Sequence, residues 1–258
     1  MRVTSGGGVC ATALLAAVSV TSCTVEGRGS EARAFEEALQ PLHQAKSFRM
    51  VGEFRDADGA RTGFDARLDG RGACKGSVGD AESLLLGKQV WTRWTDSALP
   101  AAVSRLAGDT EVPTLDPVED PAEDVQWAAV NLLRGTYMVT ALPGDVPASE
   151  GIAPVCGTGR LLAGAATGAG DVTSGPVTVR GGERLRPLSR TVGPVTVRVY
   201  VPERGEAKLR LAEYQVQGGR SFSMRFSELG KPVTVSRPDG EQTVAVGDVM
   251  AVLRQDGA

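Results

Sequence analysis

The chain has 258 residues, a formal net charge of −3 and 41% hydrophobic residues. This length is ample for a hydrophobic core and fits one large β-rich domain or two small ones. The slightly acidic balance gives no reason to expect nucleic acid as a partner. Zinc or copper sites need clustered Cys and His side chains, and one His with four Cys cannot build them once the cysteines are assigned below.

The first residues have the three parts of an export signal. Arg2 forms a short positive region, residues 9–20 form an apolar region, and small residues lead to Cys23. The apolar region is too short to span a bilayer stably, which favours cleavage. Val20-Thr21-Ser22-Cys23 resembles the bacterial lipobox. That resemblance implies a signal peptide over 1–22 and a diacylglyceryl group on Cys23.

The lipobox resemblance also predicts a location. Two acyl chains at Cys23 anchor a protein stably, whereas one chain binds a membrane only marginally. We therefore expect a lipidated tether over 23–30 and an exported protein at the outer face of the cytoplasmic membrane. Membrane lipid would be its partner through the covalent anchor. The alternative is an ordinary secretory signal in which Cys23 follows the apolar run by chance.

The cysteines divide between these roles. Cys10 leaves with the signal and Cys23 receives lipid, so Cys74 and Cys156 remain in the exported chain. Two cysteines outside the cytosol usually form a disulfide. We expect a bridge between them, and two free buried thiols are the alternative.

The spacing of apolar residues predicts the elements of the first half. Apolar residues at helical spacing indicate a helix over about 31–46. Alternation with a period of two then predicts antiparallel strands, with Asp58-Gly59 as the first hairpin turn. The predicted strands cover 48–55, 64–69, 74–78, 83–86 and 89–95.

The middle of the chain is predicted to be helical. A helix over 98–107 precedes an acidic, Pro-containing loop over 109–124. A second helix starts at Pro121 and ends at Gly135. Residues 143–157 are predicted as a loop, with a short helix starting near Cys156.

Strand-like alternation returns from about residue 172. It is clearest over 195–201, 209–216 and 222–226. Two meanders therefore flank a helical middle, and no spacing marks a domain boundary. We predict one α+β domain over 31–238, followed by a C-terminal extension over 239–258 for which the sequence suggests no role.

No catalytic constellation stands out. His43, the only histidine, lies on the first predicted helix without an obvious partner, and no GxSxG motif is present. Gly157-Thr158-Gly159 begins like a dinucleotide-binding loop, but Leu162 stands where the third glycine belongs. We expect no enzymatic activity, no cofactor and no metal ion. A carboxylate pair for glycoside hydrolysis stays open, although aromatic residues are only 5% of the chain.

Charged residues give two weaker signals. Asp56, Asp58 and the acidic loop 109–124 are possible calcium donors, but no EF-hand pattern is present, and a solvated loop is the better interpretation. Residues 180–210 hold eight basic side chains against three acidic ones. This basic stretch either faces anionic lipid headgroups or is the solvated face of a sheet.

The order of these features resembles actinobacterial cell-envelope lipoproteins, including the mycobacterial LppX/LprG group, and more distantly the LolA/LolB lipoprotein carriers. The resemblance rests on the lipobox, the N-terminal helix, the helical middle, and the segment 226–235 near the end of the second meander. Cys74 and Cys156 stand where related lipoproteins often carry a pair.

The resemblance implies a strongly curved antiparallel β-sheet, a half-barrel, wrapped around a few helices and enclosing an apolar cavity. It implies binding or carriage of a lipid or another hydrophobic ligand at the cell envelope. The alternative is a structural or protein-interaction lipoprotein with a self-filled core and an unknown protein partner. The candidate cavity-lining residues are Phe48, Met50, Phe54, Phe64, Leu68, Phe222, Met224 and Phe226.

Overall fold

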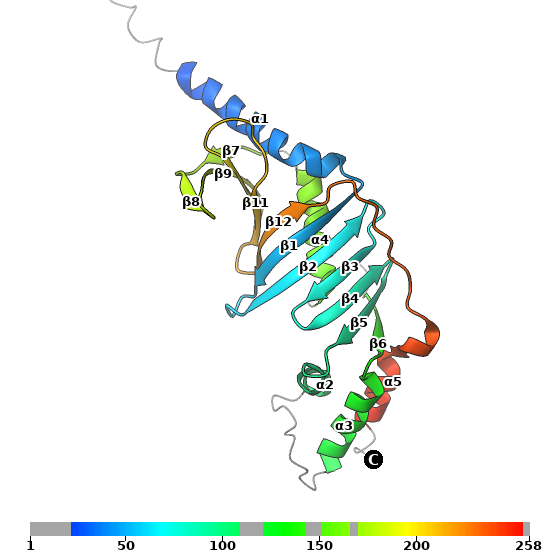
Figure 1. Cartoon of the computed structure of the whole chain (residues 1–258). Coiled ribbons are helices and arrows are strands. Elements are labelled where there is room, and N and C mark those ends of the chain that lie inside the picture. Colours follow the sequence, from blue (N-terminus) through cyan, green and yellow to red (C-terminus); the bar gives the residue numbers. More distant parts are fainter. Residues whose placement is uncertain (1–21, 109–120, 143–150, 166–169, 255–258) are drawn as a thin grey trace, which may run out of the picture.

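A computed structural model describes residues 22–108, 121–142, 151–165 and 170–254. These residues form five α-helices and one curved, unclosed sheet of 13 strands (Figure 1). The predicted α+β half-barrel is therefore confirmed. The helices are α1 (Ser22–Gln44), α2 (Leu99–Ala107), α3 (Pro121–Leu133), α4 (Ile152–Gly164) and α5 (Val246–Leu253). The strands are β1 (Ser47–Arg55), β2 (Arg61–Asp69), β3 (Cys74–Val78), β4 (Ala81–Leu86), β5 (Gln89–Trp94), β6 (Tyr137–Ala141), β7 (Val172–Ser174), β8 (Thr178–Arg180), β9 (Glu183–Val192), β10 (Val195–Pro202), β11 (Leu211–Val216), β12 (Ser221–Ser227) and β13 (Thr243–Ala245).

Two meanders meet in the centre of the sheet. The strand order is β13-β6-β5-β4-β3-β2-β1-β12-β11-β10-β9-β7, and β8 pairs with β9. The first strand of the chain therefore pairs with the last strand of the second meander, antiparallel, with Met50 opposite Phe226 and Phe54 opposite Phe222. This register places the apolar residues of β1 and β12 on one face of the sheet.

Glycines permit the curvature at two places. A Cβ on Gly52 of β1 would lie 2.1 Å from the carbonyl oxygen of Ser223, and one on Gly76 of β3 would lie 2.0 Å from that of Asp65. Gly52 is in phase with Met50, so the missing side chain belongs to the concave face. Neighbouring strands approach there more closely than any side chain would allow, which lets the sheet bend.

The helices form two groups. α1 and α4 cover the concave face, and they share the main hydrophobic cluster with the strands. α2, α3 and α5 lie together at the far end of the sheet, beside β6 (Figure 1), in a second cluster that includes Leu99, Leu133 and Val249. The predicted helices at 98–107 and 121–134 are confirmed as α2 and α3. Gly135 (φ 72°) follows α3 in the left-handed conformation typical of a helix end.

The structure differs from the sequence predictions at two helices. Residues 23–30, predicted as a tether, continue α1 in the N-terminal direction from Glu31 to Ser22. Adding a residue to an existing helix costs far less than starting one, so polar residues and two glycines do not stop it. α4 begins at Ile152, whereas a loop was predicted up to residue 157. Pro154 is compatible with a helical first turn, and packing against the sheet outweighs the low helix propensity of the glycines.

The C-terminal extension forms part of the fold. The segment after β12 runs along the ends of the strands to the opposite edge of the sheet (Figure 1). There β13 pairs with β6 in parallel, with Val244 opposite Met138. Parallel pairing needs such a long crossover. Val249 of α5 is fully buried in the second cluster, so residues 243–253 have a structural role that the sequence did not suggest.

Candidate functional site on the concave face

The eight predicted cavity-lining residues lie together. Seven are buried in the main cluster, and Phe226 is partly buried against it. The ring centroids of Phe48 and Phe226 are 5.7 Å apart, and those of Phe54 and Phe222 are 5.5 Å apart. Their shared position on the concave face follows from the register of β1, β2 and β12. Their role as the lining of a ligand cavity stays a prediction.

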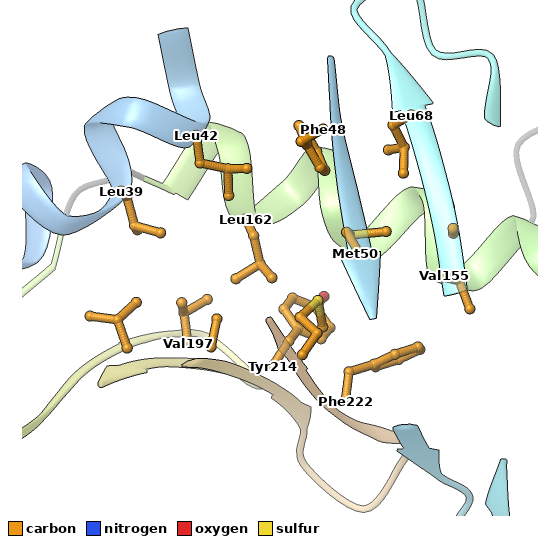
Figure 2. Close-up of a cluster of buried hydrophobic side chains, with 14 of the residues drawn as sticks. Leu39, Leu42, Phe48, Met50, Leu68, Val155, Leu162, Val197, Tyr214 and Phe222 are labelled. Carbon is orange, nitrogen blue, oxygen red and sulfur yellow. The ribbon is translucent and has the colours of Figure 1, made fainter. Parts of the chain in front are cut away.

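Figure 2 shows what covers this face. Leu39 and Leu42 of α1 and Leu162 of α4 point toward Met50, Phe222 and the neighbouring strand residues. The face is therefore occupied by side chains of the chain's own helices. A long apolar surface of this kind must be covered by helices, by ligand or by both.

A disulfide fixes α4 to the sheet. The predicted bridge between Cys74 of β3 and Cys156 of α4 is present, and both cysteines are fully buried. Gly159 brings the helix still closer, because a Cβ there would lie 2.6 Å from the sulfur of Met50. Gly157-Thr158-Gly159 thus lies inside a helix and is not a phosphate-binding loop. Its second glycine is explained by packing.

α1 is held by weaker contacts. Phe35, Leu39 and Leu42 are buried against the sheet and α4, without a covalent link among the described residues. The Nδ1 atom of His43 lies 2.9 Å from the carbonyl oxygen of Ala163 in the last turn of α4. A carbonyl only accepts hydrogen bonds, so Nδ1 is the donor. His43 therefore joins two helices, which is a structural role.

Arg190 was missed as a site residue by the sequence reasoning, which counted it only as part of the basic stretch. Its side chain is 5% exposed and lies on the concave side of β9, between Val172 and Val197 of the flanking strands. The guanidinium stacks over the ring of Phe35, with 4.6 Å from its carbon to the ring centroid. The available signal was the period of two from Leu188, which places residue 190 on the buried face.

The other basic residues of 180–210 are mostly paired on the solvent side. Arg184 donates to Glu203, and Arg210 donates to Glu183. The hydrogen bond from Arg184 lowers the pKa of the Glu203 carboxyl. These pairs fit the solvated face of a sheet better than a surface for anionic headgroups.

The proposed calcium donors that the structure describes have other partners. Arg220 donates to Asp56 at 2.5 Å, and the backbone N–H of Ala60 donates to Asp58. The acidic loop 109–124 lies outside the described residues, except for the backbone of the first turn of α3. In the described part of the chain, no three His, Cys, Asp or Glu side chains are grouped as a metal ion requires.

The anchor site is described only in its backbone. The predicted signal peptide up to residue 21 and the side chain of Cys23 lie outside the described residues, and the backbone of Cys23 is in the first turn of α1. Within the described ranges, no helix combines the length and the apolar character needed to cross a bilayer.

No family model matches the chain, and no curated protein matches it in sequence. Among solved structures, LprF from Mycobacterium bovis matches with a TM-score of 0.46 and 11% identity over 82% of this chain and 98% of its own. The Mycobacterium tuberculosis lipoprotein LppX matches with a TM-score of 0.41 and 11% identity over 81% and 99% of the two chains. A LolA superfamily protein from Nitrosomonas europaea matches with a TM-score of 0.25 and 11% identity over 84% and 97%.

The matched structures include members of the groups that the sequence resembles, so the predicted resemblance is confirmed as a likeness. At these identities and TM-scores it transfers no ligand or activity.

Proposed function

We propose that the chain is an exported, lipid-anchored protein of the cell envelope that holds a lipid or another hydrophobic ligand on the concave face of its sheet. The proposed role is binding or carriage, without catalysis. One observation carries the proposal: a continuous apolar face is covered by two helices, of which, among the described residues, only α4 has a covalent link to the sheet. α1 is the cover that an apolar ligand would replace.

The energetics of such an exchange are balanced. Moving α1 exposes Phe35, Leu39 and Leu42, and each fully buried side chain of this kind is worth about 1.5–3 kcal/mol. An acyl chain laid on the same surface recovers about 0.8 kcal/mol for each buried CH₂. A chain of about ten or more carbons therefore compensates for the loss of α1.

The proposed anchor adds a location. With lipid on Cys23, the outer face of the cytoplasmic membrane is where the domain would reside. Because α1 starts beside Cys23 and ends against the sheet, the helix that carries the anchor also covers the proposed binding surface. Proximity to a bilayer would supply both the ligand and the apolar environment for an exposed α1 face.

The anchor is tested with Cys23→Ala. The variant should move to the soluble fraction or stay unprocessed, whereas Cys10→Ala, a control inside the predicted signal, should behave as the wild type. Normal membrane retention of a processed Cys23→Ala protein contradicts the anchor.

A second candidate function is a protein-interaction lipoprotein with a self-filled core. The close fit of Gly159 to Met50 favours it, because this part of the concave face has no spare space. Its partner surface would lie outside the concave face.

Organic extraction and mass spectrometry separate the two candidates. Protein purified from its native membrane should release about one non-covalent lipid per chain, beyond the lipid covalently attached to Cys23. Protein refolded from denaturant without lipid is the control and should release none. If the native material releases no non-covalent lipid, the result favours the protein-interaction lipoprotein with a self-filled core.

A further inference from the structure

Arg190 is a charged side chain in an apolar wall. The two residues paired with it across β9, Val172 and Val197, are buried in the main cluster, and Phe35 covers it from α1. Removing an ion from water costs several kcal/mol unless its hydrogen bonds and charge are well matched. The hydrogen-bond and charge partners of Arg190 therefore indicate its role.

These partners are few. One terminal nitrogen donates to the carbonyl oxygen of Ala165 at 2.9 Å, and the other lies 3.3 Å from a carboxylate oxygen of Glu36, whose side chain is 53% exposed. The buried Nε has no partner among the described residues. A guanidinium has five N–H donors in a planar fork that fits an oxyanion with two parallel bonds, and neither present contact has that form.

Capping of α4 explains only part of this arrangement. The bond to Ala165 occupies a carbonyl at the C-terminal end of α4, where the helix dipole favours a cation. His43 already binds a carbonyl of the same turn from the exposed side. Capping gives the Nε atom of Arg190 no hydrogen-bond partner. It also does not explain why the second terminal nitrogen contacts the half-exposed carboxylate of Glu36.

The side chains that α1 packs against the sheet combine a carboxylate with an apolar run, as an acidic amphiphile does. Glu36 supplies one carboxylate to Arg190, while Phe35, Leu39 and Leu42 supply an apolar run across the concave face. When α1 leaves, Arg190 loses its carboxylate and its aromatic cover together. A ligand that replaces the apolar run must therefore also supply an anion to a buried cation.

We infer that Arg190 is a binding residue for the oxyanion headgroup of an acidic amphiphile, carboxylate or phosphate, and that Glu36 with the apolar face of α1 occupies the site in its absence. The inference rests on the proposed function and narrows it to a ligand class. The headgroup replaces Glu36 at the β7 edge of the sheet, and the chain extends over Met50 and Phe222.

The test compares three probes by calorimetric titration: dodecanoate, 1-dodecanol and acetate. Hydrogen bonds to a charged group predict about ten- to a hundredfold tighter binding of dodecanoate than of dodecanol. Acetate, an anion without an acyl chain, should show no measurable binding. Tight binding of acetate alone would indicate a free-anion site and overturn the inference.

Arg190→Met should abolish the preference for dodecanoate over dodecanol, while Arg190→Lys should restore part of the preference. Arg210→Met removes an exposed, ion-paired arginine and is the control that should change nothing. A dodecanoate preference that survives Arg190→Met overturns the inference.

A second variant is informative even if Arg190→Met does not fold. Glu36→Gln weakens the contact that holds α1 over the site but keeps the arginine, so dodecanoate and dodecanol should both bind several-fold more tightly and the preference for dodecanoate should persist. No gain with either probe would mean that Glu36 does not occupy the site, and loss of the dodecanoate preference would mean that Arg190 does not bind the headgroup; either result overturns the inference. Failure of both chain-bearing probes to bind wild type would instead overturn the proposed function itself.

Discussion

Single residues set how closely the layers of this protein pack. Gly159 lets α4 lie against Met50, and Gly52 lets β1 curve against β12. Sequence alone gives such glycines no distinguishing mark, because Gly157, two residues before Gly159, has nothing within 4 Å of the place a Cβ would take. Contact with a particular side chain of another element separates the two.

This contrast gives a matched pair of substitutions. Gly157→Ala should raise the free energy of unfolding by about 0.5–1 kcal/mol, since alanine favours a helix and meets open space. Gly159→Ala should lower it by about 1–3 kcal/mol, because the new methyl group overlaps the buried Met50. Urea denaturation of both variants measures the effect. Equal gains at both positions would contradict the close fit of α4 to β1.

On the solvent face, one ion pair predicts a dependence on pH. Arg49 donates to Asp65 on the adjacent strand and lowers the pKa of that carboxyl below its ordinary value of 3.8. A group with a lowered folded pKa contributes stability that is present above pH 3.8 and is lost as the pH falls through the folded pKa.

Asp65→Asn should therefore reduce the free energy of unfolding at pH 7, and the difference from wild type should shrink as the pH falls below about 3.8. Asp58→Asn is a useful control, since Asp58 accepts a turn hydrogen bond and pairs with no arginine among the described residues. A difference that is constant from pH 7 to pH 2 would show that the pair does not stabilise the folded state.

At the scale of elements, the two helices on the concave face are attached in different ways. α4 is joined to β3 by a disulfide that closes a loop with a sequence separation of 82, whereas α1 is held by packing and by the contacts of His43 and Glu36. Cross-linking over a loop of that length stabilises a fold chiefly by restricting the unfolded chain.

Replacing Cys74 and Cys156 together by alanine should lower the free energy of unfolding by about 4 kcal/mol. Alanine leaves no buried hydroxyl, which makes it a cleaner probe than serine. Dithiothreitol should destabilise the wild type by a similar amount and leave the double variant unchanged. Equal sensitivity of both proteins to the reductant would mean that the bridge does not stabilise the native state.

The sequence predicted elements well where periodicity is strong. The strands β1–β5 and β10–β12 and the helices α2 and α3 follow from alternation, helical spacing, and Pro121 and Gly135 at the helix ends. It placed the start of α4 too late, near Cys156, because the residues before it have the composition of a loop. It also gave no role to 239–258, because parallel pairing of β13 with β6 joins residues about a hundred positions apart.

The candidate site shows the same division. The concave-face residues of β1, β2 and β12 follow from an alternation that any sheet would show, so their inward position is predictable. The inward position of Arg190 also follows from its spacing to Leu188, but its contacts with Phe35 and Glu36 depend on α1 lying across β9, which the sequence does not show. Glu36, its partner, looks like any exposed helical acid until that contact is known.

For the whole molecule, the proposed lipidation site, α1 and the concave face form one continuous arrangement. α1 begins at the proposed lipidation site and ends on the apolar surface, so release of α1 toward a membrane would open that surface. The second helical group, with α5, lies at the opposite end of the sheet and keeps its own cluster. It is therefore expected to stay folded during such a movement.

Photolabelling tests the central claim, that a hydrophobic ligand binds the concave face. A twelve-carbon fatty acid bearing a diazirine near its end would be irradiated with the full chain, and labelled peptides identified by mass spectrometry. The account predicts labels within 47–55 and 221–227, which hold Met50 and Met224, and their loss on addition of excess dodecanoate. Labels confined to the second helical group or to the solvent face, or no label that dodecanoate displaces, would contradict it.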